Sequence, residues 1–125
     1  MARRRMIVPE IWQSESFAQL SILAKLVFIG LFSNADDEGR GIANPVYIKS
    51  ILFPYDDGMR VIDIEKALSE IGQFMSVTLY THDGRKYYAL DNWKKSQTID
   101  RPKPSKLPPP TDEKSISDES PKDRR

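Results

Sequence analysis

Apolar residues recur along this chain in helical stretches, followed by a stretch in which they alternate with polar residues. From Ile22 to Phe32 they cover most of a helix circumference, and Ser21 precedes them as a candidate N-cap. This pattern predicts a helix at the centre of the core. It is expected to end near Asn34, because Asn and Asp disfavour continuation and Gly39 permits a turn.

A short strand and two further helices are predicted next. The run from Gly41 to Ala43 is long enough for a short strand, and Asn44-Pro45 places a cap before a proline at the first helical position. That helix is expected to stop at Pro54. Asp63 is predicted to cap a third helix, whose apolar residues fall three and four positions apart and face the core. These apolar residues are Ile64, Ala67, Leu68, Ile71 and Met75.

The folded part closes with a predicted β-hairpin. Residues 77–80 and 87–90 flank an Asp83-Gly84 pair, which favours a tight turn. The order of elements predicts an α+β fold of the winged-helix type, with a three-helix core and a two- or three-stranded antiparallel wing. The domain is assigned to residues 6–93. Prolines dominate the chain after Trp93, so residues 94–125 are predicted to form a basic, Pro-rich and then charged disordered tail.

Length and composition limit the classes of protein to consider. At 125 residues and 39% hydrophobic content, the chain can build one domain with a modest core. The absence of cysteine excludes disulfides and thiolate metal sites, and fits a reducing cytoplasm. Polar residues after Pro9 interrupt any signal-peptide apolar region, and the apolar run 20–32 is shorter than the roughly 20 residues that span a bilayer. We therefore expect a cytoplasmic protein without a membrane partner.

Charge is distributed unevenly along the chain. The net charge is +1, yet acidic residues outnumber Lys and Arg between Ile11 and Trp93. Basic residues precede this acidic body at 3–5 and follow it between Lys94 and Lys106. If the protein binds DNA, attraction to phosphates is therefore expected from the flanks and the wing.

With its elements in place, the chain resembles the N-terminal winged-helix domain of phage replication-initiation proteins, the replisome-organiser group related to DnaD-like primosome components. The resemblance covers roughly residues 6–108. It is carried by Leu20-Ser21, Ala24-Lys25-Leu26, Phe28-Ile29-Gly30-Leu31, the run Ala35 to Arg40, Ile48-Lys49, the run Leu52 to Asp57, Tyr87-Tyr88, Asn92-Trp93 and Ser105. It implies a domain that binds origin DNA or self-associates in the cytoplasm of a bacterial host, and a later helical domain that contacts helicase machinery.

The expected function is therefore a non-catalytic DNA-binding module in the initiation of phage DNA replication, with DNA and other replication proteins as partners. The third helix exposes polar side chains suited to groove contact, but Glu65 and Glu70 on its surface repel phosphates, and a plain solvated face is the alternative. The basic segment after Lys94 is expected to leave the fold close to the hairpin. The expected DNA contacts are Arg3, Arg4, Arg5, Lys66, Ser69, Gln73, Arg85, Lys86, Lys94, Lys95, Arg101 and Lys103.

Other candidate chemistry is sparse. The run Asp36 to Glu38 offers carboxylates for a hard cation, but a helix exit in which one carboxylate pairs with Arg40 or bonds turn amides is favoured. His82 is the single histidine of the chain, and the sequence holds no cysteine or second histidine to share a metal with it, so a role as ligand or general base is not expected. No catalytic residue, cofactor or metal is expected. Four aromatic residues could stack on single-stranded bases or simply pack in the core: Trp12, Trp93, Tyr47 and Tyr55.

Two alternatives to DNA binding in replication remain. The first is a protein-interaction module that self-assembles through its sheet edge, its N-terminal segment or both, which the acidic body favours. The second is a winged-helix transcription regulator, because one fold serves many functions.

Overall fold

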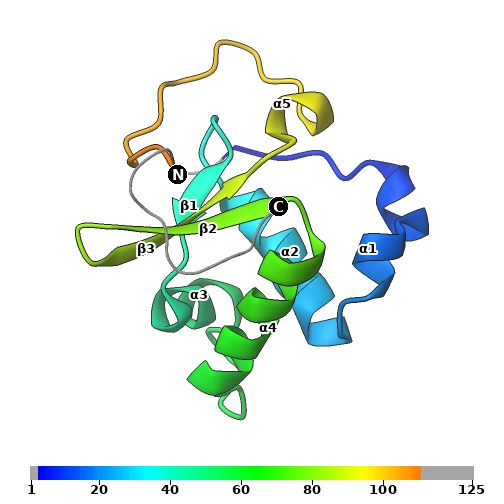
Figure 1. The fold of residues 1–125 in the computed structure, drawn as a ribbon, viewed down its shortest axis with the longest axis vertical. Coiled ribbons are helices and arrows are strands. Elements are labelled where there is room, and N and C mark those ends of the chain that lie inside the picture. Colours follow the sequence, from blue (N-terminus) through cyan, green and yellow to red (C-terminus); the bar gives the residue numbers. More distant parts are fainter. Residues whose placement is uncertain (1–2, 111–125) are drawn as a thin grey trace.

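The predicted helices form in the predicted order in the computed structural model, which describes residues 3–110 (Figure 1). Within that part of the chain the structure is α+β, with a small antiparallel sheet beside a group of helices. The helical elements are the 3-10 helix η1 (Pro9–Gln13), α1 (Glu15–Ala18), α2 (Ile22–Asn34), α3 (Pro45–Leu52), α4 (Val61–Phe74) and α5 (Trp93–Ser96).

Helix starts follow the capping residues of the sequence. Ser21 Oγ accepts a hydrogen bond from the Ala24 N–H at 3.1 Å, and Asn44 caps α3 with Pro45 at its first position. Both predicted caps are confirmed. The prediction that Asp63 caps the third helix is wrong, because α4 begins two residues earlier. The Asp63 carboxylate instead accepts a hydrogen bond from the Arg60 backbone N–H at 3.0 Å from within the first turn.

The sheet joins the hairpin to the short strand that precedes α3. Its strands are β1 (Arg40–Ile42), β2 (Val77–His82) and β3 (Arg85–Leu90), in the antiparallel order β1-β3-β2. His82 pairs with Arg85, so the loop between β2 and β3 has two residues. Asp83 and Gly84 have φ angles of 51° and 77°, as a tight hairpin turn requires. The predicted hairpin is confirmed.

The core lies where three helices and the sheet meet. Its largest fully buried side chains are Val27 on α2, Ile48 on α3, and Ile64 and Ile71 on α4. Tyr88 of β3 enters the same core and donates a hydrogen bond from its hydroxyl to the Leu31 carbonyl at 2.6 Å. Because α2 ends at Asn34, this carbonyl belongs to the last turn, whose acceptors need partners outside the helix.

This buried hydrogen bond predicts a measurable cost for removing one hydroxyl. Tyr88→Phe is expected to lower the free energy of unfolding by about 1–3 kcal/mol, because it leaves the Leu31 carbonyl buried without its donor. Urea denaturation followed by circular dichroism measures the change. Tyr55→Phe is the matched control, since Tyr55 is 96% exposed. Equal stability of the two variants would contradict the assigned role of the Tyr88 hydroxyl.

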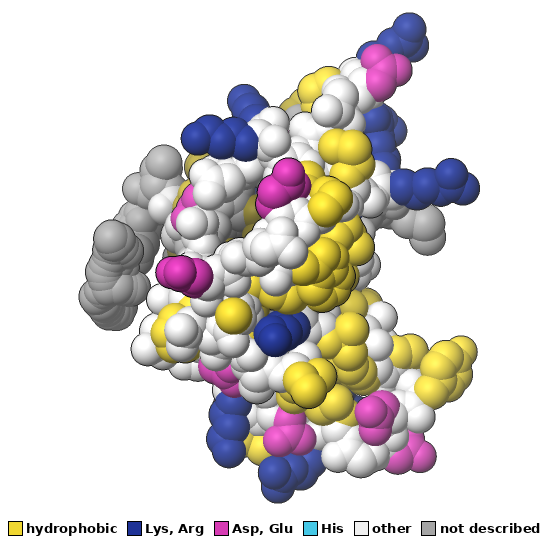
Figure 2. Space-filling view, turned by 90° about the vertical axis from the view of Figure 1, so that its right-hand side faces the viewer, with side chains coloured by type: hydrophobic (Ala, Val, Ile, Leu, Met, Phe, Trp, Pro, Cys, Tyr) yellow, Lys and Arg dark blue, Asp and Glu magenta, His cyan; other side chains and the backbone are white. Residues whose placement is uncertain are grey.

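Helix α2 is buried on one side rather than all round. Ile22 and Leu26, one turn apart, are 84% and 53% exposed, so the prediction of a helix enclosed at the centre of the core is wrong for this face. Apolar side chains gather on the side of the molecule that carries α1 (Figure 2). The apolar side chains of this helix therefore lie partly in the core and partly on the surface.

The chain after β3 turns back along the domain. Leu107 packs against the ring pair Tyr80 and Tyr87, and the Tyr80 hydroxyl donates to the Pro108 carbonyl at 2.7 Å. The expected proximity of this segment to the hairpin is thus confirmed. The structure differs from the predicted tail over residues 94–110, because the first of these residues form α5 and Leu107 and Pro108 contact the sheet. Residues 111–125 lie outside the described residues. No helix among residues 3–110 is both long enough and apolar enough to cross a bilayer.

Candidate nucleic-acid interface

The tip of the β2–β3 hairpin presents two cations. Arg85 and Lys86 are exposed, and the tip projects beyond the neighbouring elements (Figure 1). The exposed Asp83 carboxylate lies 3.4 Å from His82 Nε2. The two cations at the start of β3 are therefore accessible to a phosphate backbone.

The solvent face of α4 is polar with mixed charge. Lys66, Ser69 and Gln73 are exposed on it, as predicted from helical spacing. Glu70, however, turns to the start of α2, where its carboxylate accepts from the Ser21 N–H at 2.7 Å and from the Ser21 hydroxyl at 3.0 Å. This contact places negative charge near a helix N-terminus, where it is favourable. Of the two glutamates expected to repel phosphates, Glu65 is exposed and Glu70 is engaged within the domain.

The two basic flanks, Arg3–Arg5 and Lys94–Lys106, lie side by side. Arg3 donates hydrogen bonds to the carbonyls of Asp100 at 2.6 Å and Arg101 at 3.1 Å. The Gln97 side chain both accepts from the Met6 N–H and donates to the Met6 carbonyl, each at 2.9 Å. Cations that are almost a whole chain length apart in the sequence are thereby brought to one side of the molecule.

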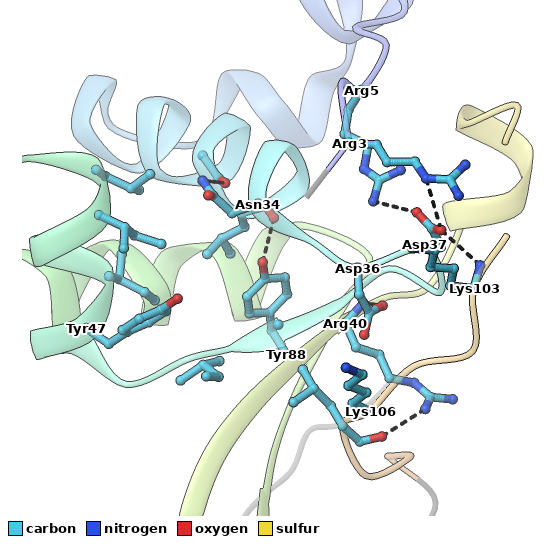
Figure 3. Close-up of a pocket in the computed structure, with 18 of the residues that line it drawn as sticks. Arg3, Arg5, Asn34, Asp36, Asp37, Arg40, Tyr47, Tyr88, Lys103 and Lys106 are labelled. Atoms are coloured by element: carbon cyan, nitrogen blue, oxygen red, sulfur yellow. Dashed lines mark hydrogen bonds and ion pairs between the residues drawn. The ribbon is translucent and has the colours of Figure 1, made fainter. Parts of the chain in front are cut away.

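An acidic turn, Asp36-Asp37-Glu38, holds these flanks in place (Figure 3). Asp36 Oδ1 accepts from the N–H groups of Glu38 at 2.9 Å and Arg40 at 3.0 Å, which confirms the predicted loop-organising role. Asp36 Oδ2 also accepts from the Ser105 hydroxyl, and Glu38 accepts from the Ser105 N–H at 2.6 Å. The acidic turn therefore anchors the C-terminal flank as well as itself.

Arg5 is a structural residue, which corrects its predicted role as a DNA contact. Its side chain is 2% exposed, and its guanidinium donates to the Ala35 carbonyl at 2.7 Å and to Asp37 Oδ1 at 3.0 Å. The guanidinium also lies 4.9 Å from the Trp93 ring centroid. A charge buried among these partners cannot reach a phosphate, and its desolvation is offset by the paired carboxylate.

Asp37 connects the two flanks electrostatically. Its Oδ2 accepts from the Lys103 N–H at 2.9 Å and lies 3.4 Å from Arg3 Nε. The hydrogen bond from the Lys103 backbone, followed by the contacts with Arg5 and Arg3, lowers the pKa of Asp37 below its ordinary value of 3.8. Asp37 is therefore ionised at neutral pH. Arg3 is partly committed to it, with 38% of its side chain exposed.

Four aromatic residues were considered for base stacking. Trp93 is 4% exposed, which confirms packing as its role, whereas Trp12, Tyr47 and Tyr55 are exposed. That the acidic turn anchors the flanks was not predicted from the sequence, although the charge of the turn is opposite to that of both flanks and could have indicated it.

The other predicted cations of the flanks face solvent. They are Arg4, Lys94, Lys95, Arg101 and Lys103, together with Lys106, which was not among the predicted contacts.

Within residues 3–110 no group of three or more histidine, aspartate or glutamate side chains is arranged to hold a metal ion. The carboxylates of the acidic turn accept hydrogen bonds from backbone, serine and arginine donors instead.

Comparison of the chain with protein-family models, with curated proteins and with solved structures finds no match.

Proposed function

We propose that this chain is a non-catalytic DNA-binding module of the winged-helix type that acts in the initiation of phage DNA replication. The order α2, β1, α3, α4, β2, β3 supports the winged-helix assignment, with α4 as the third core helix and the β2–β3 hairpin as the wing. The role in replication rests on the sequence resemblance. The location follows as the cytoplasm of a bacterial host.

The observation that carries the proposal is the convergence of the two basic flanks. Arg3 bonds to the backbone at Asp100 and Arg101, so the N-terminal flank lies against the C-terminal flank. We take the exposed cations Arg4, Lys94, Lys95 and Arg101 of these flanks as one positive surface. A concentrated positive surface on an acidic body attracts phosphates to one side and disfavours contact elsewhere. DNA is expected to meet this surface and the wing cations Arg85 and Lys86. The face of α4 contributes polar contacts through Lys66, Ser69 and Gln73.

Duplex binding at two salt concentrations tests the proposal. Fluorescence anisotropy with a labelled duplex is expected to show a Kd that rises about a hundredfold or more between roughly 50 and 200 mM salt, because several phosphates are contacted. Undetectable binding at the lower salt concentration would overturn DNA binding.

Neutralising individual cations should identify the residues that bind phosphate. Arg85→Gln and Lys94→Gln are each expected to weaken duplex binding and to reduce the slope of log K against log salt by about one for each phosphate that is no longer neutralised. Lys25→Gln is the control, since Lys25 belongs to α2 rather than to the flanks or the wing, and its ammonium lies 5.6 Å from the ring centroid of Phe17 on α1. An equal decrease in affinity in all three variants would show that net charge alone, rather than this surface, governs binding.

Self-assembly is the second candidate function, and the exposed apolar face of α2 favours it. Ile22 and Leu26 leave an apolar face of α2 in water, and such faces are typical of interaction sites. Figure 2 shows that apolar side chains gather on the side of the molecule that carries α1. Light scattering of the wild type and of Ile22→Ser/Leu26→Ser tests this candidate. A dimer that dissociates in the double variant would support it, and a monomeric wild type at high concentration would exclude it.

A further inference from the structure

A groove between α2, α3, β1 and the C-terminal flank borders the core, and the flank cations Arg3, Lys103 and Lys106 lie along it. It is open to solvent on one side, and its volume of about 870 Å³ lies within the range of roughly 300–1,000 Å³ common for ligand sites. Tyr88 lies at its middle, between Tyr47 at one end and the side chains of Arg40 and Lys106 at the other (Figure 3). The groove therefore has two chemically different ends.

Its first end is apolar. Helix α3 exposes Tyr47 by 44% and Ile51 by 37%, one turn apart and on the same side of the helix, and Ile42 at the end of β1 is 38% exposed. Their neighbour Ile48 is fully buried, so the helix needs no exposed apolar side chains to hold its place in the fold. These three residues leave an apolar wall in contact with water.

Its second end is cationic. Arg3, Arg40, Lys103 and Lys106 border it. Asp36 and Asp37 keep their negative charge at this end, but the cations that line the groove, which also include Arg5, outnumber these two aspartates. An incoming acidic group would meet exposed ammonium groups at Lys103 and Lys106.

We propose that this groove binds a short acidic, amphipathic peptide segment of a partner protein. Apolar side chains of the segment lie against Tyr47 and Ile51, and carboxylates beside them face Lys106 and Lys103. The sugar-phosphate backbone of a duplex matches the cationic end but has no apolar side chains to cover Ile42 and Ile51, so a peptide with both kinds of side chain fits the groove better. The groove is not lined by the cations of the wing or of α5, but its lining includes Lys103, one of the expected DNA contacts.

A fluorescent synthetic peptide with leucines spaced three and four residues apart and glutamates between them serves as the probe. It is titrated with the full chain, and a second peptide with lysine in place of glutamate controls for nonspecific adhesion. Tyr47→Ser/Ile51→Ser is expected to weaken binding of the acidic peptide about tenfold or more. Lys106→Glu is expected to weaken it about fivefold.

Matched variants outside the groove separate this site from general stickiness. Val46→Ser removes an apolar side chain from α3 that is 61% exposed but does not line the groove, and Lys94→Glu reverses a cation on α5. Both are expected to bind the acidic peptide like the wild type. Circular dichroism and urea midpoints confirm that all variants are folded.

Several results would overturn the inference. One is an absence of peptide binding, and another is an equal decrease in affinity in the groove variants and the control variants. A third is weaker binding with Lys106→Glu but not with Tyr47→Ser/Ile51→Ser, because this result would show that charge alone governs the contact. Dissociation of a homodimer by Tyr47→Ser/Ile51→Ser would make a second copy of the chain the occupant. If duplex DNA displaces the peptide and Lys106→Glu weakens duplex binding as much as Arg85→Gln does, the groove belongs to the DNA surface. Duplex binding without peptide binding leaves the proposed function intact.

Discussion

Replacing Gly39 with alanine is expected to lower the free energy of unfolding by about 2–4 kcal/mol. Gly39 has a φ of +81°, which L-residues rarely adopt. A Cβ atom there would also lie 2.6 Å from Cγ of the Trp93 ring. Trp93 cannot move aside easily, because it is buried, lies beneath Arg5, and donates a hydrogen bond from Nε1 to the Asp37 carbonyl at 2.9 Å.

Gly84→Ala separates the two causes of this destabilisation. Gly84 has a similar φ of +77°, but a Cβ atom there would meet nothing within 4 Å. Gly84→Ala should therefore lower the free energy of unfolding only by the backbone strain, about 1–2 kcal/mol. Urea denaturation of both variants under identical conditions gives the comparison. Similar destabilisation of the two variants would show that the contact between residue 39 and the Trp93 ring adds nothing to the cost of the backbone strain.

Asp37→Asn is expected to lower the urea midpoint and to loosen both flanks together. The substitution removes the negative charge that faces the buried Arg5 guanidinium and the nearby Arg3. An uncompensated buried charge is strongly destabilising. The amide group of asparagine also brings N–H donors to a place where the carboxylate accepts from Arg5 and from the Lys103 backbone. Hydrogen exchange should therefore accelerate around Met6 and Lys103 before it does in α4.

The same carboxylate predicts a dependence of stability on pH. Its pKa in the folded state lies below the ordinary value of 3.8, so the unfolded chain binds its proton at higher pH than the folded protein does. The stabilisation is complete above the unfolded-state pKa and is lost as the pH falls through the folded-state pKa. The wild type should therefore lose stability below about pH 4.

Comparison of pH profiles checks this assignment. The profile of Asp37→Asn is expected to be flatter than that of the wild type between about pH 5 and 2. A part of the slope should remain, because the pKa of Asp63 is also lowered, mainly by the hydrogen bond from the Arg60 backbone. Parallel profiles for Asp37→Asn and the wild type would contradict a major role for Asp37.

The acidic turn connects stability to the proposed function. By holding Arg3 and the Lys103 backbone, Asp37 keeps the two basic flanks adjacent, and adjacent cations bind phosphates better than scattered ones. Part of that binding capacity is taken up by the turn itself, since Arg5 is buried against it. The positive surface is therefore smaller than the charge of the flanks in the sequence suggests.

Local signals in the sequence determined the elements. Ser21 and Asn44 mark helix starts because their side chains satisfy backbone N–H groups a few residues away, and Asp83-Gly84 marks the hairpin because its two positions need positive φ. Such interactions lie within a few residues of the chain, so the sequence contains all their partners. The buried stripe of α4 was predictable for the same reason, through its spacing of three and four.

Tertiary structure alone decided which charged and apolar side chains remain available. Arg4 and Arg5 are neighbours in a uniform basic run, yet one is exposed and the other is buried beside Asp37 and Trp93. Glu70 bonds to Ser21 on another helix, and Ile22 remains in water although its helix is apolar on nearly every side. These outcomes depend on residues tens of positions away in the chain, and periodicity and local composition contain no information about such partners.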